Sequence, residues 1–246
     1  MKALILAAGI GSRLAPLTDT LPKALVQIGG KTLLQIVLDR LSYWKFDEII
    51  INIFHHADQV KRFIEKYAEQ NPKITIKISR EEHLLDTGGG IKKMLNFLRS
   101  DEPVLVHNVD IISGIDLQEF YQNHCRSGAT TSLAVQKRPS SRPLLFDETL
   151  HLCGRLHPKT GNYTIVTKPT GHVSEFSFCG IQIIDPKLFL TYPADKFYSI
   201  DVYLKAAAAG QLIRGHVCDN IYWKDVGTVQ AIQQVEADIE RGITSI

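Results

Sequence analysis

A short apolar run near the start of the chain ends in a glycine-containing loop, and this junction constrains the fold more than any other segment. Residues 3–8 are all apolar, and Gly9 and Gly11 follow at once, with Arg13 shortly after. An apolar run of this length that stops at glycines is typical of a strand buried inside an α/β sheet. Glycine lets the backbone approach a ligand closely, and successive free N–H groups bind anions. We therefore expect this loop to bind a polyphosphate, with Arg13 and Lys23 as cations.

Considered alone, the loop is equally well interpreted as an ordinary tight turn at the end of a strand. Gly9 and Gly11 are not followed by the third glycine of the dinucleotide-binding fingerprint, and no Gly-Lys-Ser/Thr triplet of a P-loop follows. Phosphate binding is favoured because Arg13 and the Pro22-Lys23 step add positive charge to the glycines. A nucleotide is the ligand that this combination predicts.

Length and composition limit the classes of protein to which the chain can belong. Its 246 residues, 44% of them hydrophobic, suffice for one α/β domain with a sizeable core. A net charge of +2 provides no strong basic field for nucleic acid or for a membrane surface. The four cysteines are widely spaced and form no CxxC pair, which favours free thiols in a reducing compartment. No apolar run approaches the roughly 18 residues of a membrane span, so we expect a cytoplasmic protein.

The first half of the chain alternates between helical and strand periodicities. Apolar spacing predicts helices over 34–41, 57–70 and 91–98, and β-branched or alternating runs predict strands over 48–54, 74–78 and 104–106. Strands that alternate with helices indicate a mostly parallel sheet with helices on both faces.

The second half contains several short strand-like segments instead. Segments 129–137, 142–146, 162–168 and 175–184 are broken by Pro, Gly and Ser, and we interpret them as antiparallel or mixed strands that extend the sheet and wall a pocket. Helices are expected over 200–209 and 229–239, the second packing back on the core. No linker or internal repeat is present, so we expect one domain, 1–246, with a substrate-side lobe.

Two carboxylates follow segments that we expect to end at the same edge of the sheet. Asp110 comes just after the strand at 104–106, and ligands of open α/β sheets bind beyond the carboxyl ends of strands. Asp225 lies in an abrupt polar turn before the last helix. Each has a plain alternative, since polar residues often end strands and carboxylates often cap helices. Together they could hold one Mg²⁺, which prefers one or two carboxylates completed by phosphate oxygens and water.

Three consecutive glycines, Gly88 to Gly90, precede the helix expected from Ile91 onward. Because glycine is entropically costly to order, such a run indicates backbone that lies flat against a base or a phosphate, although a flexible connection is the alternative. The nine histidines show no metal-binding spacing, and no GxSxG elbow is present. A reaction that needs no protein nucleophile is therefore favoured.

The motifs occur in an order that resembles the sugar-1-phosphate nucleotidyltransferase family over nearly the whole chain. They are LAAGxGSRL with PLT and PKAL downstream, then TGGGI, Asn-x-Asp, EFSFCGIQIIDP and WKDVGT. Within the family, the chain is similar to the branch of the N-acetylmuramate-1-phosphate uridylyltransferases, with mannose- and heptose-1-phosphate guanylyltransferases as close relatives. The resemblance implies a Rossmann-like, GT-A-like three-layer α/β/α sandwich with a mixed, mostly parallel central sheet and an antiparallel substrate-side extension. It further implies a nucleotide-binding half, 1–128, and a sugar-binding half with the C-terminal helix, 129–246.

The resemblance also implies a role for individual residues. Arg13 would act on the departing pyrophosphate and Lys23 on the α-phosphate, as the catalytic cations. Asn108 and Gly180 would face the sugar phosphate, and Asp110 and Asp225 would hold Mg²⁺. The nucleoside triphosphate, UTP or GTP, would contact residues of two motifs, which are Leu6, Ala7, Ala8, Gly9, Gly11, Ser12, Arg13, Lys23, Gly88 and Gly89.

Departures from the family pattern leave the sugar and the base open. Segment 138–168 does not match the sugar-recognition region of the muramate enzymes, Thr167 stands where a glutamate precedes Lys-Pro, and Val109 replaces the usual glycine. UTP with N-acetylmuramate 1-phosphate is the preferred pair, and a GTP-dependent mannose or heptose enzyme is the alternative. A regulatory domain without turnover is a further alternative. A dinucleotide-dependent oxidoreductase ranks last, because no acid ends the second strand at His55-His56.

Overall fold

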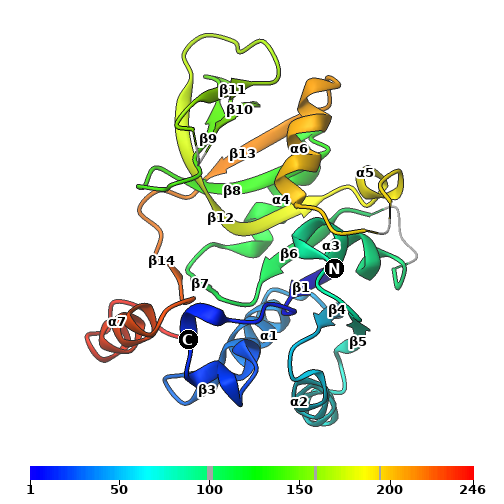
Figure 1. Ribbon diagram of the computed structural model, residues 1–246, viewed down its shortest axis with the longest axis vertical. Coiled ribbons are helices and arrows are strands. Elements are labelled where there is room, and N and C mark those ends of the chain that lie inside the picture. The colour runs from blue at the N-terminus through cyan, green and yellow to red at the C-terminus, as the bar shows by residue number, and fades with distance from the viewer. Residues whose placement is uncertain (99–101, 158–159, 194) are drawn as a thin grey trace.

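The computed structural model describes residues 1–98, 102–157, 160–193 and 195–246. Within these residues, ten strands form one sheet in the order β11-β10-β9-β12-β6-β1-β4-β5, with β8 paired to both β12 and β13 (Figure 1). The strands are β1 (Lys2–Leu6), β4 (Glu48–Ile53), β5 (Thr75–Arg80), β6 (Val104–Asn108), β8 (Thr131–Gln136), β9 (Leu144–Phe146), β10 (Leu152–Leu156), β11 (Tyr163–Ile165), β12 (Ser174–Ile184) and β13 (Ile213–Val217).

The four strands β6, β1, β4 and β5 are parallel, as the periodicity predicts. Strand β1 ends at Leu6, two residues before the apolar run does. The ladder stops there because the N–H group of Ala7 donates to the side-chain Oδ1 of Asn52, at 2.6 Å. Ala7 and Ala8 therefore belong to the loop and not to the strand.

Helices cover both faces of the sheet, which confirms the three-layer sandwich (Figure 1). Alternate residues of a strand point to opposite faces, so Ala3 and Ile5 join one apolar cluster and Leu4 joins the other. The first cluster contains residues of α1 (Leu33–Tyr43), α2 (Ala57–Gln70) and α4 (Leu117–Ser127). The second contains residues of α3 (Asp86–Leu95), α5 (Lys187–Leu190) and α6 (Ser199–Ala208). None of the helices in the described ranges is long and apolar enough to cross a membrane.

Side-chain caps fix the start of several helices. Thr32 accepts a hydrogen bond from the Gln35 N–H at 3.1 Å, and Asp116 accepts one from Glu119 at 2.8 Å. Such caps satisfy N–H groups that have no partner inside the helix. Helix α7 (Val229–Glu240) begins in the same way at Thr228, the last residue of the WKDVGT motif. The motif therefore supplies both a turn and a helix cap.

The prediction that the three glycines precede the third helix is wrong. Helix α3 begins at Asp86 and contains Gly88 to Gly90. The N–H group of Gly88 donates to the carbonyl oxygen of Phe197 at 2.8 Å. A Cβ atom on Gly88 would meet the Phe197 ring, and one on Gly89 would meet the backbone carbonyl of Asp195. The glycines thus let the segment before α6 lie directly against the helix.

The second half forms the expected antiparallel extension around the long strand β12. This strand is antiparallel to β6, β8 and β9, and its register with β8 shifts between Phe178 and Gln182. Gly180 lies inside this bulge with a φ of 73°. Strands β10 and β13 and helix α4 are additions that the sequence patterns do not reveal. Residues 158–159 of the 138–175 segment lie outside the described residues.

The last part of the chain returns to the first half, as expected for the C-terminal helix. Strand β14 (Trp223–Asp225) pairs with β7 (Ile111–Ser113), and α7 contacts β2 (Gln27–Ile28). Strand β2 forms a hairpin with β3 (Lys31–Thr32). Ile232 and Val235 of α7 are buried in the first apolar cluster.

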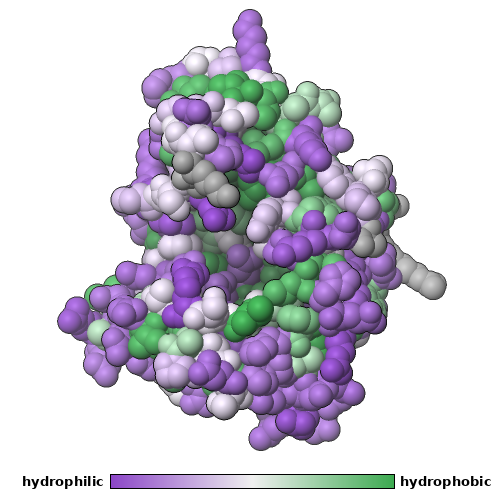
Figure 2. Space-filling view, viewed as in Figure 1, coloured by the Kyte–Doolittle hydropathy of each residue, from purple (hydrophilic) through white to green (hydrophobic). Residues whose placement is uncertain are grey.

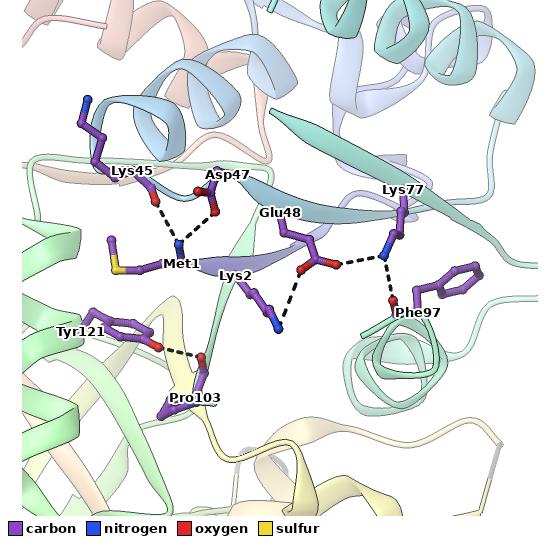
Figure 3. A network of polar contacts seen from close by, with 9 residues as sticks. All are labelled: Met1, Lys2, Lys45, Asp47, Glu48, Lys77, Phe97, Pro103 and Tyr121. Carbon is purple, nitrogen blue, oxygen red and sulfur yellow. Dashed lines mark hydrogen bonds and ion pairs between the residues drawn. The ribbon is translucent and has the colours of Figure 1, made fainter. Parts of the chain in front are cut away.

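Polar contacts close the edge of the sheet at which the parallel strands begin (Figure 3). The amino group of Met1 donates to Asp47 at 3.0 Å, and the carboxylate of Glu48 binds both Lys2, at 3.8 Å, and Lys77, at 2.9 Å. Partly exposed ion pairs of this kind contribute little stability each. Their position leaves the opposite edge, at the carboxyl ends of β1, β4 and β6, free for a ligand.

Candidate active site

A cavity of about 320 Å³ lies at the carboxyl ends of the parallel strands, where open α/β sheets bind ligands. Residues from the loop after β1, from the ends of β4 and β6, and from the start of α3 line it. The space-filling view is hollowed at mid-height, between the part that holds β1–α2 and the part that holds β8–β13 (Figure 2). A cavity of about 350 Å³ beside α4 and β13 contains none of the predicted site residues, so chemistry and not size identifies the candidate site.

The loop after β1 is a compact turn that requires glycine at one position. Gly11 has a φ of 75°, and its carbonyl oxygen accepts hydrogen bonds from the Leu14 N–H, at 2.8 Å, and the Thr18 hydroxyl, at 2.9 Å. A Cβ atom on Gly11 would lie 3.0 Å from Cβ of Lys23. Glycine therefore permits both the left-handed backbone and the close approach of Lys23. Six of the predicted nucleotide-binding residues line the cavity, and these are Leu6, Ala8, Gly9, Gly11, Ser12 and Lys23.

Each predicted catalytic cation is paired with a predicted metal-binding carboxylate. The ammonium group of Lys23 binds the carboxylate of Asp110, and the two side chains are only 11% and 16% exposed. Arg13 and Asp225 lie 3.8 Å apart and are more open, at 63% and 41%. Short 3-10 helices at Ser12–Leu14 and Lys23–Leu25 carry the two cations. The site thus contains two cations and two carboxylates that face one another.

The pairing of β7 with β14 brings Asp110 and Asp225 together although they are far apart in the sequence. Asp225 is the register partner of Ile111, and the Val226 N–H donates to the backbone carbonyl oxygen of Asp110 at 2.9 Å. One oxygen of Asp225 accepts a hydrogen bond from the Gly227 N–H at 2.8 Å. The close approach of Arg13 requires glycine at position 227, because a Cβ atom there would meet the guanidinium group.

Asp110 and Asp225 are two carboxylates of the kind that can hold a metal ion together with its substrate. Among the described residues, no group of three or more His, Cys, Asp or Glu side chains could hold a metal ion by itself. Magnesium is commonly bound by one or two carboxylates, with phosphate oxygens and water as the remaining ligands. The partial exposure of Asp110 and Asp225 leaves room for such ligands.

Asn108 and Gly180 lie next to each other, although Gly180 itself does not line the cavity. Asn108 ends β6 and lines the cavity, and a Cβ atom on Gly180 would lie 3.0 Å from Nδ2 of Asn108 and 2.8 Å from Ile111. The β12 bulge is therefore pressed against the strand end that carries Asn108. Thr167 and Lys168 lie elsewhere, beside a cavity of about 220 Å³.

Comparison with known proteins decides the family. The model of the nucleotidyl transferase family matches residues 2–151 of the chain. An N-acetylmuramate alpha-1-phosphate uridylyltransferase from Caulobacter vibrioides is 30% identical over 245 residues, which cover 96% of this chain and 95% of that protein. The chain belongs to the nucleotidyl transferase family. It is a sugar-1-phosphate nucleotidyltransferase, and the predicted branch of the family is confirmed.

Two other similarities place this nucleotidyltransferase among its relatives. A mannose-1-phosphate guanyltransferase from Emericella nidulans is 31% identical over 189 residues, or 76% of this chain and 50% of that protein. The chain thus matches only half of that relative. A solved structure of a putative glucose-1-phosphate thymidylyltransferase from Bacillus anthracis has a TM-score of 0.80 at 19% identity, and covers 100% of this chain and 97% of that one. This structural similarity concerns the fold, which agrees with the predicted class.

Four predicted nucleotide-binding residues of the nucleotidyltransferase do not line the cavity: Ala7, Arg13, Gly88 and Gly89. Arg13 pairs with Asp225, which is not among the lining residues either. The N–H group of Ala7 is occupied by Asn52, and Gly88 and Gly89 face residues 195–197. The cavity is instead lined by Asp86 and Thr87, the first two residues of the same helix. The glycines help to shape the site through packing, because they bring the segment before α6 close to it.

Two further residues of the cavity were missed in the sequence. Asn52 donates from Nδ2 to Glu81 at 2.7 Å, and the other Glu81 oxygen accepts from the Leu85 N–H at 3.1 Å. Glu81 is only 4% exposed, and burial raises the pKa of its carboxyl group. An asparagine within the apolar strand 48–54 was the available signal, since a polar residue in a buried strand needs a partner.

Proposed function

We propose that this nucleotidyltransferase transfers a uridylyl group from UTP to N-acetylmuramate 1-phosphate, with Mg²⁺ as its cofactor, and releases pyrophosphate. The supporting observation is that Lys23 pairs with Asp110 and Arg13 with Asp225 beside the loop of Gly9 and Gly11, and that Lys23 and Asp110 line the cavity. The similarity of 30% over 96% of the chain to a uridylyltransferase supports this choice of substrates. The reaction would serve the salvage of a cell-wall sugar in the cytoplasm, with UTP and the sugar phosphate as partners and no part for a nucleic acid or a membrane.

The reaction requires positioning and charge neutralisation more than acid–base chemistry. An ionised oxygen of the sugar phosphate attacks the α-phosphorus in line, a new P–O bond forms, and pyrophosphate leaves with the electrons of the broken P–O bond. Because the attacking oxygen is already ionised near neutral pH, no general base is needed. Catalysis of this kind rests on preorganised charges and alignment.

In this proposal, different residues bind the metal, neutralise the phosphate charges and orient the sugar phosphate. Asp110 and Asp225 would hold Mg²⁺, which neutralises charge on the phosphate oxygens when it is bound. Lys23 would exchange Asp110 for the α-phosphate, and Arg13 would exchange Asp225 for the departing pyrophosphate. Asn108 and the backbone at Gly180 would orient the sugar phosphate. The nucleoside would lie beside the amino end of α3, where Asp86 and Thr87 line the cavity.

Gly88 and Gly89 would act on the nucleotide indirectly in this proposal. They admit the segment that carries Tyr198, and Tyr198 lines the cavity. Residues 1–128 would then form the nucleotide-binding half, and residues 129–246 would provide the sugar-binding half and the C-terminal helix. Strand β14 is the exception. Its residue Asp225 lies in the sugar-binding half but would bind the metal ion together with Asp110 of the nucleotide-binding half.

A GTP-dependent mannose-1-phosphate or heptose-1-phosphate guanylyltransferase is the second candidate. The similarity of 31% over 76% of the chain to a mannose-1-phosphate guanyltransferase favours it. The two candidates share the phosphate chemistry and differ only in the base and the sugar.

Pyrophosphate release with Mg²⁺ distinguishes the candidates. UTP, GTP, CTP and dTTP are each tested with the 1-phosphates of N-acetylmuramate, N-acetylglucosamine, glucose, mannose and heptose. We expect the largest kcat/KM for UTP with N-acetylmuramate 1-phosphate. A larger value for GTP with mannose or heptose 1-phosphate would favour the second candidate. Nucleotide binding without turnover for any pair would favour a regulatory domain.

A further inference from the structure

The side chain of Arg138 lies across the indole ring of Trp223. Its guanidinium carbon is 3.6 Å from the ring centroid, well within the range of a cation–π contact. Arg138 follows strand β8, and Trp223 opens strand β14, which ends at Asp225. The contact therefore joins the sugar-facing part of the chain to the short strand that carries a proposed metal ligand.

Both partners of this contact are also tied to strand β12 just before its bulge. Nη2 of Arg138 donates to the carbonyl oxygen of Phe178, and Nε1 of Trp223 donates to that of Cys179, each at 2.8 Å. The hydroxyl of Ser177 donates to the carbonyl oxygen of Arg138 at 2.8 Å. Three consecutive residues of β12 thus hold the stacked pair, and Gly180 is the next residue along the strand.

Strand β14 is short, and its contacts besides that with Arg138 include those with β7, β12 and α7. It has only three residues, none of them buried, and within the described residues it pairs with a single strand, β7. Trp223 and Asp225 are two residues apart, so their side chains lie on the same side of the strand. Burial lowers the pKa of the Arg138 guanidinium, and the nearby Cys179 and Asp225 oppose this effect. Arg138 is therefore close enough to feel the charge of Asp225.

We propose that Arg138 is a positioning residue for the metal site: its stacking on Trp223 and its bond to Phe178 hold β14 in place, so that Asp225 faces Asp110. This inference rests on the proposed function, because it takes the two carboxylates as the metal ligands. Arginine suits the task because its planar guanidinium stacks on a ring and donates hydrogen bonds in its own plane at once. Lysine keeps the charge but loses the planar group.

The neighbouring residue Lys137 provides a matched control. Its ammonium group lies 5.5 Å from the centroid of the Phe176 ring, which is a second cation–π contact at the end of β8. Phe176 belongs to β12 and packs edge-on against Phe146 of β9. Removing the side chain of Lys137 therefore deletes the same charge and a similar contact, and leaves the stacking on β14 intact.

The experiment measures Mn²⁺ binding to the enzyme–UTP complex by the loss of the free-ion EPR signal. It compares Arg138→Ala, Arg138→Lys and Lys137→Ala with the unaltered enzyme. We expect Arg138→Ala to weaken Mn²⁺ binding by about 10-fold, the size of effect that supporting residues have at metal sites. Arg138→Lys should show a smaller loss, and Lys137→Ala should stay within about twofold. Turnover of Arg138→Ala should recover at saturating Mg²⁺, because a variant that has lost only metal affinity is fully loaded there.

Unchanged Mn²⁺ affinity in a folded Arg138→Ala protein would overturn the inference. Should that variant fail to fold, Arg138→Lys decides, since it keeps the charge but loses the planar group that stacks on Trp223 and donates to Phe178. Unchanged Mn²⁺ binding in a folded Arg138→Lys protein would then overturn the inference. Asp225→Asn separates this inference from the proposed function. If Asp225→Asn retains full Mn²⁺ affinity, the proposed metal site itself is wrong, whereas a loss there with none in Arg138→Ala contradicts only the role of Arg138.

Discussion

The loop after β1, on the proposed nucleotide side of the cavity, is held by hydrogen bonds between residues close in sequence. The region of Asn108 and Gly180, on the proposed sugar side, depends on segments far apart. Gly11 is fixed by hydrogen bonds from Leu14 and Thr18. Asn108 and Gly180 meet only because β12 pairs with β6 and bulges beside it. The first arrangement involves hydrogen bonds within residues 11–18 only. The second can be altered by changes in β8, β9 or β12 without any change in the nucleotide loop.

The names of relatives of this chain differ in the sugar and the base, as those of the N-acetylmuramate uridylyltransferase and the mannose guanyltransferase do. The glycine loop, both cations and both carboxylates come together from strand ends, which the fold itself brings to one edge. The sugar side is a long strand with neighbours on both sides, so substitutions there reshape the pocket. We therefore expect mutations on the nucleotide side and mutations on the sugar side to alter different kinetic parameters.

The largest effect is expected on the nucleotide side, from Lys23→Ala. The variant removes the proposed partner of the α-phosphate and leaves Asp110 without its cation, so turnover should fall by roughly 10²–10³, as for other preorganised charges. Steady-state pyrophosphate release measures it. Lys31→Ala is the matched control, because Lys31 forms a surface ion pair with Asp39 at 3.1 Å. A folded Lys23→Ala protein with full activity would contradict the assignment of Lys23.

Gly180→Ala tests the sugar side with a smaller effect. Its φ of 73° disfavours any Cβ, at a cost of about 1–2 kcal/mol, and the added atom would lie 2.8 Å from Ile111. We expect KM for the sugar phosphate to rise and KM for UTP to stay unchanged. Gly210→Ala is the control, because its φ of 81° carries the same backbone strain with nothing within 4 Å. Equal changes in both KM values would contradict the assignment of Gly180 to the sugar side alone.

Asn52→Ala tests whether the nucleotide side relies on one buried network. The variant leaves the Ala7 N–H and the Glu81 carboxyl group without their partner. Buried polar groups that lose a partner cost about 1–3 kcal/mol each, so the free energy of unfolding should fall by that order in urea titrations. Binding of UTP should weaken more than binding of the sugar phosphate. Stability equal to that of the unaltered protein would mean that water replaces the amide group.

The last effect concerns stability against pH, with none expected on substrate binding, and lies outside both sides of the cavity. Burial lowers the pKa of His124 from 6.5 to about 4. Between these values the unfolded chain binds a proton that the folded protein does not, so this contribution to stability is present above pH 6.5 and is lost as the pH falls toward 4. The slope is about 1.4 kcal/mol per pH unit.

Chemical denaturation between pH 4 and 7.5 measures this slope. His124→Gln should reduce it, and His172→Gln, a change in an exposed loop, should not. UTP and sugar-phosphate KM values at pH 7.5 should be unchanged in both variants. An unaltered slope in His124→Gln would show that other groups cause the loss of stability in acid.

The sequence was sufficient where local pattern determines structure. The helix expected over 57–70 has the bounds of α2, and the strand-end rule located Asp110 next to the cavity. Apolar periodicity and strand order are local properties, and parallel strands always bring their carboxyl ends to one edge. The pairing of Lys23 with Asp110 and of Arg13 with Asp225 agrees with the order of the motifs, and the roles of these four residues stay predictions.

The remaining features depend on contacts between distant segments, which no local pattern encodes. Gly88 and Gly89 are glycines because residues 195–197 lie against them, and the sequence contains no sign of that contact. Strand β13 is positioned by its pairing with β8. The positioning role that we propose for Arg138 depends on its contact with Trp223. The sugar-facing side consists largely of such contacts, which is why the sugar could be proposed only from relatives.

A direct competition between substrates tests whether UTP and N-acetylmuramate 1-phosphate are the preferred pair. The enzyme receives equal concentrations of UTP and GTP together with N-acetylmuramate 1-phosphate and mannose 1-phosphate in Mg²⁺ buffer, and mass spectrometry resolves the nucleotide sugars formed at early times. We expect UDP-N-acetylmuramate to be the main product. GDP-mannose as the main product would contradict the proposed pair of substrates.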